Sequence, residues 1–223
     1  MVELAIIEPN TEVVRHLVLA ELLAQRGIEN FKPEQLKRDD FGKPYLDLEE
    51  SLIGYSFSNA RFDGGSFGLM AVADGSAIGI DVELWPKRSG DQVFVESVAA
   101  PEDDVILRGL GMGGYDAGLA LWVIKEAALK CSGEVMVDPR NLAVSQYRDG
   151  PFRVSPSLLA GAALQEFSVA LFELRVEKWP EHLFLCGAAM PQLHSFAQKT
   201  LQKISFNAVG WQLSQFAPRL KLN

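Results

Sequence analysis

The first hydrophobic segments of the chain predict a strand followed by a helix. VELAII, near the amino terminus, is a short apolar run of the kind found in buried strands. The segment TEVVRHLVLAELLAQRG predicts a helix, because its apolar residues recur every three or four positions: Val14, Leu17, Val18 and Leu22. Thr11 or Asn10 would cap the start of this helix, and Gly27 would end it.

The middle of the first half changes from helical spacing to strand patterns. A polar stretch, EQLKRDDFGKPY, predicts a loop around Lys43, because Gly42 and Pro44 interrupt regular structure there. LIGYSFSN and SFGLMAVA then read as strands, and the pair Asp74-Gly75 is a turn signal that leads into AIGIDVEL. These three runs predict an antiparallel meander.

The second half repeats the order of helix and then strands. After an irregular acidic stretch, YDAGLALWVIKEAALKCSG predicts a second long helix, and the following runs read as strands: EVMV, NLAVSQYR, EFSVALFELRV and HLFLCGAA. The sequence therefore predicts an α+β fold with two halves, 1–76 and 77–190. For the tail, 191–223, we expect a partly helical segment packed on the body, because four apolar residues lie at roughly helical spacing: Leu193, Phe196, Leu201 and Ile204.

Composition narrows the class of protein. The chain has two cysteines without a CxxC motif, which disfavours a disulfide scaffold or a zinc site and fits a reducing compartment. An acidic amino terminus without a long apolar run argues against export or membrane insertion. The net charge of −8 argues against general nucleic-acid binding, although the segment from His182 onward carries four basic and no acidic residues. We expect a cytoplasmic monomer with an acidic body and a basic tail.

Two carboxylates interrupt the apolar strand AIGIDVEL. Residues two apart point to the same side of a strand, so Asp81 and Glu83 should stand together while Ile80 and Val82 face the other way. Like charges at this separation raise each other's pKa unless a cation lies between them. A lone DxE pair is most often only the polar face of a half-exposed strand, and taken alone it predicts nothing more.

A third carboxylate lies on the second helix. Glu126 shares an apolar face with Trp122 and Val123, and burial of an unpaired carboxylate is costly. Two explanations are open at this point. Lys130, four residues later, could form a salt bridge with Glu126 within the helix. Alternatively, Glu126 could join Asp81 and Glu83 around Mg²⁺, with Lys125 and Lys130 beside phosphate oxygens of a substrate.

Three blocks in this order resemble a known family. FGKPYL at 41–46, IGIDVE at 78–83 and WVIKEAALK at 122–130 are similar to the signatures of the larger, monomeric 4'-phosphopantetheinyl transferases of the type that activates surfactin synthetase. The likeness extends from about residue 15 to about residue 189. It implies a pseudo-dimer of two helix-plus-antiparallel-sheet halves with coenzyme A in the cleft between them. Such enzymes transfer the phosphopantetheine arm to a serine of an acyl or peptidyl carrier protein.

The resemblance also implies roles for individual residues. Asp81, Glu83 and Glu126 would bind Mg²⁺ at the pyrophosphate of coenzyme A, and Glu126 or Glu102 would accept the proton of the attacking serine. Lys130 would assist catalysis. The residues implied to contact coenzyme A are Arg15, Lys43, Pro44, Ser58, Asn59, Lys125 and Lys130, although Lys125 could equally be structural.

Departures from the family pattern keep two alternatives open. Asn59 stands where the family has a histidine on a coenzyme A phosphate, and asparagine carries no charge at any pH. Residues 1–14 also contain no Lys or Arg. One alternative is therefore a degenerate homologue that binds coenzyme A or a partner protein without turnover. The other is an unrelated Mg²⁺-dependent phosphoesterase, which would explain DxE but neither GKP nor KEAALK.

Overall fold

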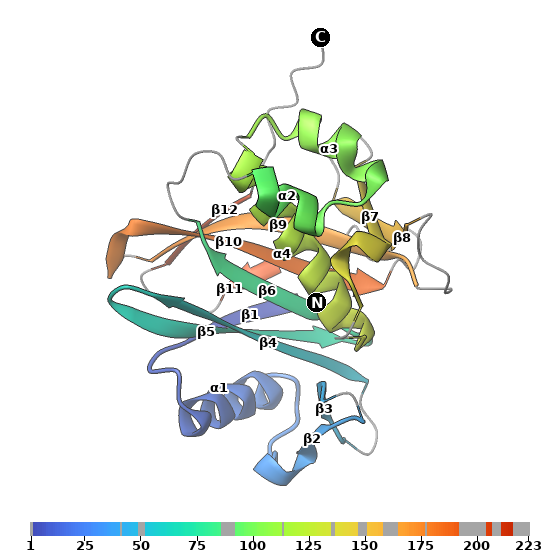
Figure 1. Ribbon diagram of the computed structural model, residues 1–223. Coiled ribbons are helices and arrows are strands. Elements are labelled where there is room, and N and C mark those ends of the chain that lie inside the picture. The colour runs from blue at the N-terminus through green and yellow to red at the C-terminus, as the bar shows by residue number, and fades with distance from the viewer. Residues whose placement is uncertain are drawn as a thin grey trace.

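The computed structural model describes most of the chain up to residue 191 and two segments beyond it. The described ranges are 2–40, 42–48, 52–85, 92–112, 114–134, 137–146, 151–157, 165–176, 178–191, 204–206 and 211–215. Antiparallel sheets and helices are stacked in layers (Figure 1), which confirms the predicted α+β class. The internal relation between the two halves, and a ligand cleft between them, stay predictions.

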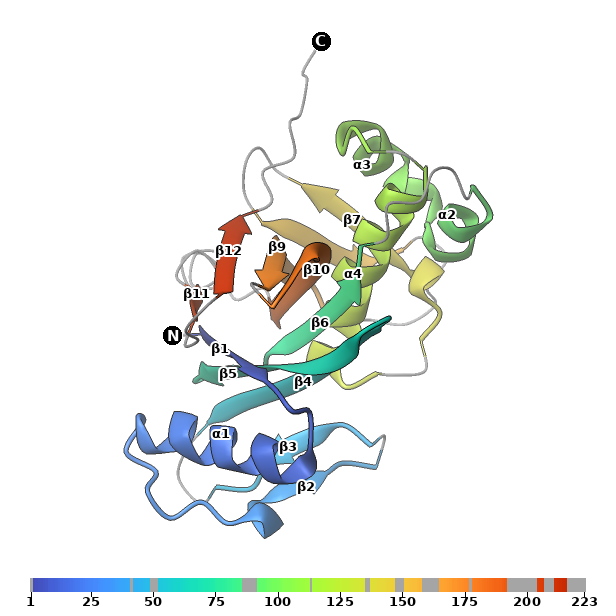
Figure 2. The same ribbon diagram turned by 90° about the vertical axis from the view of Figure 1, so that its left-hand side faces the viewer.

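The first sheet carries one long helix on its outer face. Its strand order is β11 (Ile204–Phe206), β1 (Val2–Ile7), β5 (Gly65–Asp74) and β4 (Ile53–Phe62), and all neighbours are antiparallel except β11 and β1. Helix α1 (Glu12–Ala24) packs on this sheet, and the hairpin β2 (Leu36–Arg38) and β3 (Pro44–Leu46) lies beside α1 (Figure 2). The Thr11 hydroxyl caps α1 by accepting a hydrogen bond from the Val14 amide.

The second sheet lies between the first sheet and helix α4 (Gly114–Ser132). Its order is β6 (Gly79–Leu84), β10 (Trp179–Pro191), β9 (Phe167–Val176), β8 (Phe152–Pro156) and β7 (Leu142–Gln146), and β12 (Trp211–Gln215) pairs with the remaining part of β9. Helices α2 (Gln92–Val98) and α3 (Asp104–Gly109) lie beside α4 at the top of Figure 1. No helix in the described ranges is both long and apolar enough to cross a membrane.

Alternation along the central strands explains the layers. In β10, Phe184 and Cys186 face the first sheet, whereas Leu185 and Ala189 face α4. Both sheets are thus covered on two sides, and strands buried on both faces read as nearly continuous apolar runs. This burial is why the sequence predicted β1, the hairpin β4–β5, α4, β7, β9 and β10, all of which the structure confirms.

Three predictions about local structure were wrong in whole or in part. The third strand of the expected meander, β6, leaves β5 and pairs with β10 in the other sheet. Lys43 lies in the expected loop, but the residues on either side of this loop form the strands β2 and β3, and the acidic stretch is largely helical, as α2 and α3. The predicted helix α1 is present, but Leu17 is 65% exposed, and the buried residues of α1 are Leu19, Leu22 and Leu23.

The tail prediction falls mainly outside the described residues. Leu193, Phe196 and Leu201 are not among them, and neither are Val135 and Met136, the middle of the predicted strand EVMV. Ile204, which we expected on a helix, begins strand β11. The prediction of a helix was based on spacing alone, and the two described tail segments instead pair with β1 and β9. Strand β8, which separates β7 from β9, was missed, although buried Phe152 and Val154 alternate with exposed Arg153.

Close packing of β6 on α4 gives a stability prediction. A Cβ on Gly79 would lie 2.0 Å from the Ala127 carbonyl oxygen and 2.4 Å from the Cys131 amide nitrogen. Because both contacts are helix backbone, neither can move aside, and Gly79→Ala should cost about 3 kcal/mol in the free energy of unfolding. Urea denaturation measures this cost. Gly187→Ala, whose nearest contact would be 2.9 Å, is the matched control with a smaller expected loss, and equal stability of both variants and wild type would contradict this packing.

Candidate functional site

The predicted carboxylates lie where the edge strands of the two sheets meet under α4. Strand β6 is the edge of the second sheet and β4 the edge of the first. Ile80 and Val82 belong to the core between the sheets, so Asp81 and Glu83 lie on the α4 side, as the alternation predicted. The Ser56 hydroxyl accepts a hydrogen bond from the Ile80 amide, which ties β4 to β6 without a ladder between them. The site thus combines residues from both sheets and one helix.

Asp81 is the most buried of the three carboxylates, and its two oxygens differ. Oδ1 accepts hydrogen bonds from the Lys130 ammonium at 2.5 Å and from the Ser58 hydroxyl at 3.0 Å. The Lys130 ammonium also donates to the Ser58 Oγ at 3.0 Å. Oδ2 is buried and has no hydrogen-bond partner among the described residues. A buried carboxylate oxygen without a donor is costly, so this atom is suited to a cation.

Glu83 and Glu126 are half-buried beside Asp81. Burial raises the pKa of both carboxyls, and the negative charge of Asp81 raises them further. The Trp122 indole donates to Glu83 at 3.4 Å, and the charge of Lys130 opposes the increase in pKa at both glutamates. Lys130 bonds to Asp81 rather than to Glu126, so the simple salt bridge within α4 does not explain the buried Glu126.

The three carboxylates fit a hard divalent cation in charge and in donor type. When ionised, they and the Lys130 ammonium leave two negative charges, and all available ligands are oxygens. Within the described ranges, no group of three or more His, Cys, Asp or Glu side chains is already arranged tightly enough to hold a metal ion. An ion bound to Asp81 Oδ2 would therefore have to draw the two glutamates closer.

The residues expected to contact coenzyme A lie on several elements around this centre. Lys43, at the start of the β3 hairpin arm, donates through Nζ to the Cys131 carbonyl at 2.6 Å, so the hairpin is attached to the end of α4. Arg15 lies over the Phe57 ring, with its guanidinium carbon 5.0 Å from the centroid. The Asn59 carbonyl accepts a hydrogen bond from the Asn10 amide at 2.6 Å, which leaves the Asn59 amide group as the donor toward a ligand.

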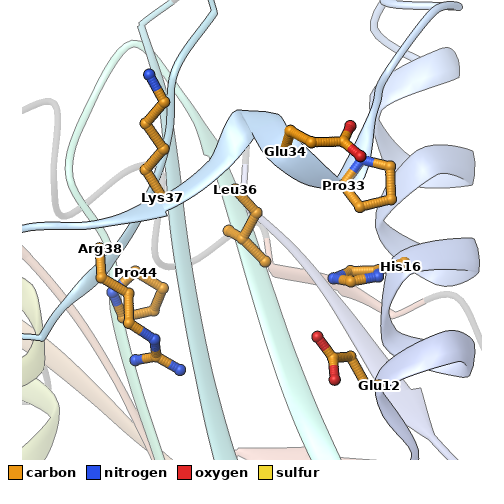
Figure 3. A pocket seen from close by; sticks show the side chains of 8 residues that line it. All are labelled: Glu12, His16, Pro33, Glu34, Leu36, Lys37, Arg38 and Pro44. Atoms are coloured by element: carbon orange, nitrogen blue, oxygen red, sulfur yellow. The ribbon is translucent and has the colours of Figure 1, made fainter.

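A pocket of about 330 Å³ opens between α1 and the β2–β3 hairpin (Figure 3). Pro44 is the one predicted site residue that lines it, and the other lining residues were not predicted: Glu12, His16, Pro33, Glu34, Leu36, Lys37 and Arg38. Glu12 and His16 come from α1, and Arg38 comes from β2 (Figure 3). The pocket was missed because the stretch that carries Arg38 was read as a loop, and the sequence therefore did not indicate that this stretch lies opposite α1.

Lys125 and Glu102 lie away from the three carboxylates, on another side of α4. The Lys125 side chain is 0% exposed, and its ammonium donates to Asp103 at 2.5 Å and to the Val98 carbonyl at 2.8 Å. Burial lowers the pKa of Lys125, and the charge of Asp103 works against this decrease. Glu102 accepts hydrogen bonds from the Ser157 hydroxyl and contributes to the electrostatics of Lys125. This arrangement favours the structural role for Lys125 and separates Glu102 from Glu126.

No protein-family model matches the chain, and no curated protein is significantly similar to it.

Proposed function

We propose that this protein transfers the 4'-phosphopantetheine arm of coenzyme A to a serine of an acyl or peptidyl carrier protein, with Mg²⁺ bound at Asp81, Glu83 and Glu126. The observation that carries the proposal is the buried, unpartnered Oδ2 of Asp81 beside two glutamates with raised pKa and one lysine. A site of oxygen ligands with two excess negative charges suits a divalent ion, and the bound ion would in turn attract a pyrophosphate. The order of GKP, DxE and KEAALK supplies the substrate class.

In the proposed reaction, the serine oxygen attacks the phosphorus that carries the pantetheine arm. The P–O bond to the second phosphate breaks, its electron pair goes to the leaving adenosine 3',5'-bisphosphate, and the serine proton goes to a carboxylate. When bound, Mg²⁺ would stabilise the negative charge that develops on the leaving oxygen. Glu126 is the preferred proton acceptor, because it lies beside Asp81, whereas Glu102 lies with Ser157 on the other side of α4.

The remaining residues of the site would bind and orient coenzyme A. Lys130 is the cation nearest to Asp81, so it is placed to pair with a phosphate oxygen that reaches the same carboxylate. Lys43 would exchange the Cys131 carbonyl for a phosphate, and Arg15, on α1, would add a third cation. Ser58 holds Asp81 Oδ1 in place, and this contact is independent of any contact with coenzyme A.

One observation favours the second candidate, a coenzyme A-binding protein without turnover. Asn59 is uncharged and already bonded to Asn10, so it cannot supply the charge that the family places on a phosphate. Such a protein would have the same fold and binding site but would not catalyse the transfer. The difference between the two candidates is therefore measurable as turnover.

A mass-spectrometric assay tests the proposal. The protein is incubated with coenzyme A, Mg²⁺ and several apo carrier proteins, and the expected result is a carrier that has gained one phosphopantetheine arm at its serine. The same incubation with EDTA should show no gain, because the three carboxylates would lack their cation. Tight coenzyme A binding by calorimetry without any modified carrier would favour the non-catalytic homologue. Release of phosphate from simple esters without carrier modification would favour a phosphoesterase.

A further inference from the structure

Lys130 is in contact with the same carboxylate that the proposed metal requires. Its ammonium lies 2.5 Å from Asp81 Oδ1 and 3.0 Å from Ser58 Oγ. Asp81 is fixed by its position on the buried strand β6, and its side chain is only 3% exposed. The positive charge of Lys130 therefore stabilises Asp81 in the absence of any other cation.

This contact also opposes a second cation. A divalent ion on Asp81 Oδ2 would lie close to the Lys130 ammonium in a partly dehydrated site, where repulsion between like charges is poorly screened. The ion would also share with Lys130 the negative charge of the same carboxylate. Metal binding to the protein alone should consequently be weak, although the three carboxylates would otherwise attract a divalent ion.

Lys130 can leave Asp81 more easily than Asp81 can move. The Lys130 side chain is 27% exposed, and lysine carries its charge on a flexible stem with three donors. The pyrophosphate of coenzyme A brings anionic oxygens that can accept the ammonium and also contribute ligands to a metal ion. A ligand that binds Lys130 in this way removes the opposition to the metal.

We propose that Lys130 makes divalent-metal affinity at Asp81 depend on coenzyme A, so that the metal binds weakly to the free protein and tightly to the complex. This inference rests on the proposed function for the identity of the anionic ligand. By thermodynamic linkage, the metal must raise the affinity for coenzyme A by the same factor. Lys130 then acts as the coupling residue between the two ligands, in addition to contacting phosphate.

The test measures Mn²⁺ binding by electron paramagnetic resonance, which reports free Mn²⁺, with and without saturating coenzyme A. A protein-free titration corrects for Mn²⁺ held by coenzyme A itself. For the wild-type protein we expect coenzyme A to lower the Mn²⁺ dissociation constant at least about tenfold. In Lys130→Met, Mn²⁺ should bind the free protein at least about tenfold more tightly than wild type, and coenzyme A should increase this affinity by a smaller factor than in wild type, because only the added pyrophosphate ligands would remain.

Two control variants separate charge at the site from other effects. Ser58→Ala removes a hydrogen bond to the same Asp81 oxygen without a change in charge, so it should not tighten Mn²⁺ binding. Lys178→Met removes the same charge from a surface ion pair with Glu8, so both Mn²⁺ affinities should stay as in wild type. If either control tightened Mn²⁺ binding as much as Lys130→Met, the specific role of the Lys130 charge would be disproved.

The inference can fail independently of the variants and of the proposed function. Wild-type protein that binds Mn²⁺ equally well with and without coenzyme A would overturn it, even if Lys130→Met did not fold. Phosphopantetheine transfer together with that result would leave the proposed function intact and remove only the coupling. Coupling without any transfer would have the opposite meaning: the coupling role of Lys130 would stand, and the catalytic proposal would not.

Discussion

Glu126→Gln is expected to reduce phosphopantetheine transfer by roughly a thousandfold or more, because one change removes both a metal ligand and the proposed proton acceptor. Glutamine keeps the size and polarity of the side chain, so the packing of α4 on β6 should be preserved. The initial rate of carrier modification, followed by mass spectrometry with coenzyme A and Mg²⁺, measures the loss. Glu134→Gln, an exposed residue just beyond α4, is the matched control and should keep the wild-type rate.

Stability shows whether Glu126→Gln has lost chemistry or folding. Since burial and Asp81 raise the pKa of Glu126, its ionised form destabilises the metal-free protein above the ordinary pKa of 4.5. Without metal at pH 7, the variant should therefore unfold at a higher urea concentration than wild type. This advantage should disappear as the pH falls toward 4.5, where Glu126 of the wild type becomes neutral. An active Glu126→Gln protein would exclude Glu126 as the base and leave Glu102 as the next residue to change.

Lys125→Met is expected to destabilise the protein by about 3–5 kcal/mol, because it leaves the Asp103 carboxylate buried without its counter-charge. Asp103 is 0% exposed and connects three elements: its oxygens accept from Lys125, from the Ala100 amide and from the Val144 amide. Loss of Lys125 should thus loosen the contact of α4 with the segment before α3 and with β7. Urea denaturation at pH 7 measures the change in the free energy of unfolding.

A double variant separates loss of charge from loss of packing. Lys125→Met combined with Asp103→Asn removes both charges, so it should be more stable than the sum of the single changes predicts. The change at Asp103 keeps an acceptor for only one of the two amides, because Val144 donates to Oδ1 and Ala100 donates to Oδ2. The exposed pair Arg108–Asp104 serves as the comparison, and Arg108→Met should cost less than about 0.5 kcal/mol. A cost below about 1 kcal/mol for Lys125→Met would contradict a structural ion pair and would return Lys125 to the candidates for phosphate binding.

The shared side of Asp81 and Glu83 could be predicted from sequence, because side-chain direction in a strand depends only on residue parity. The burial of α4 was also predictable, since apolar residues surround it on two sides. The partners of these residues were not predictable. Ser58 and Lys130 are 72 positions apart in the chain, and only the approach of β4 to β6 and the packing of α4 on β6 bring them to Asp81. Lys125 and Lys130 likewise have different partners, Asp103 and Asp81, because they lie on different sides of α4.

The sequence by itself determined the main helices and strands and the faces that they bury, because these follow from local periodicity. It also determined the residue types of the candidate site, because three carboxylates in apolar surroundings need a counter-charge wherever the chain places them. Only the tertiary structure decided that β6 joins the second sheet, that Lys130 neutralises Asp81 and that Lys125 pairs with Asp103. These pairings depend on contacts between segments that are distant in sequence, and such contacts form only when the layers pack together.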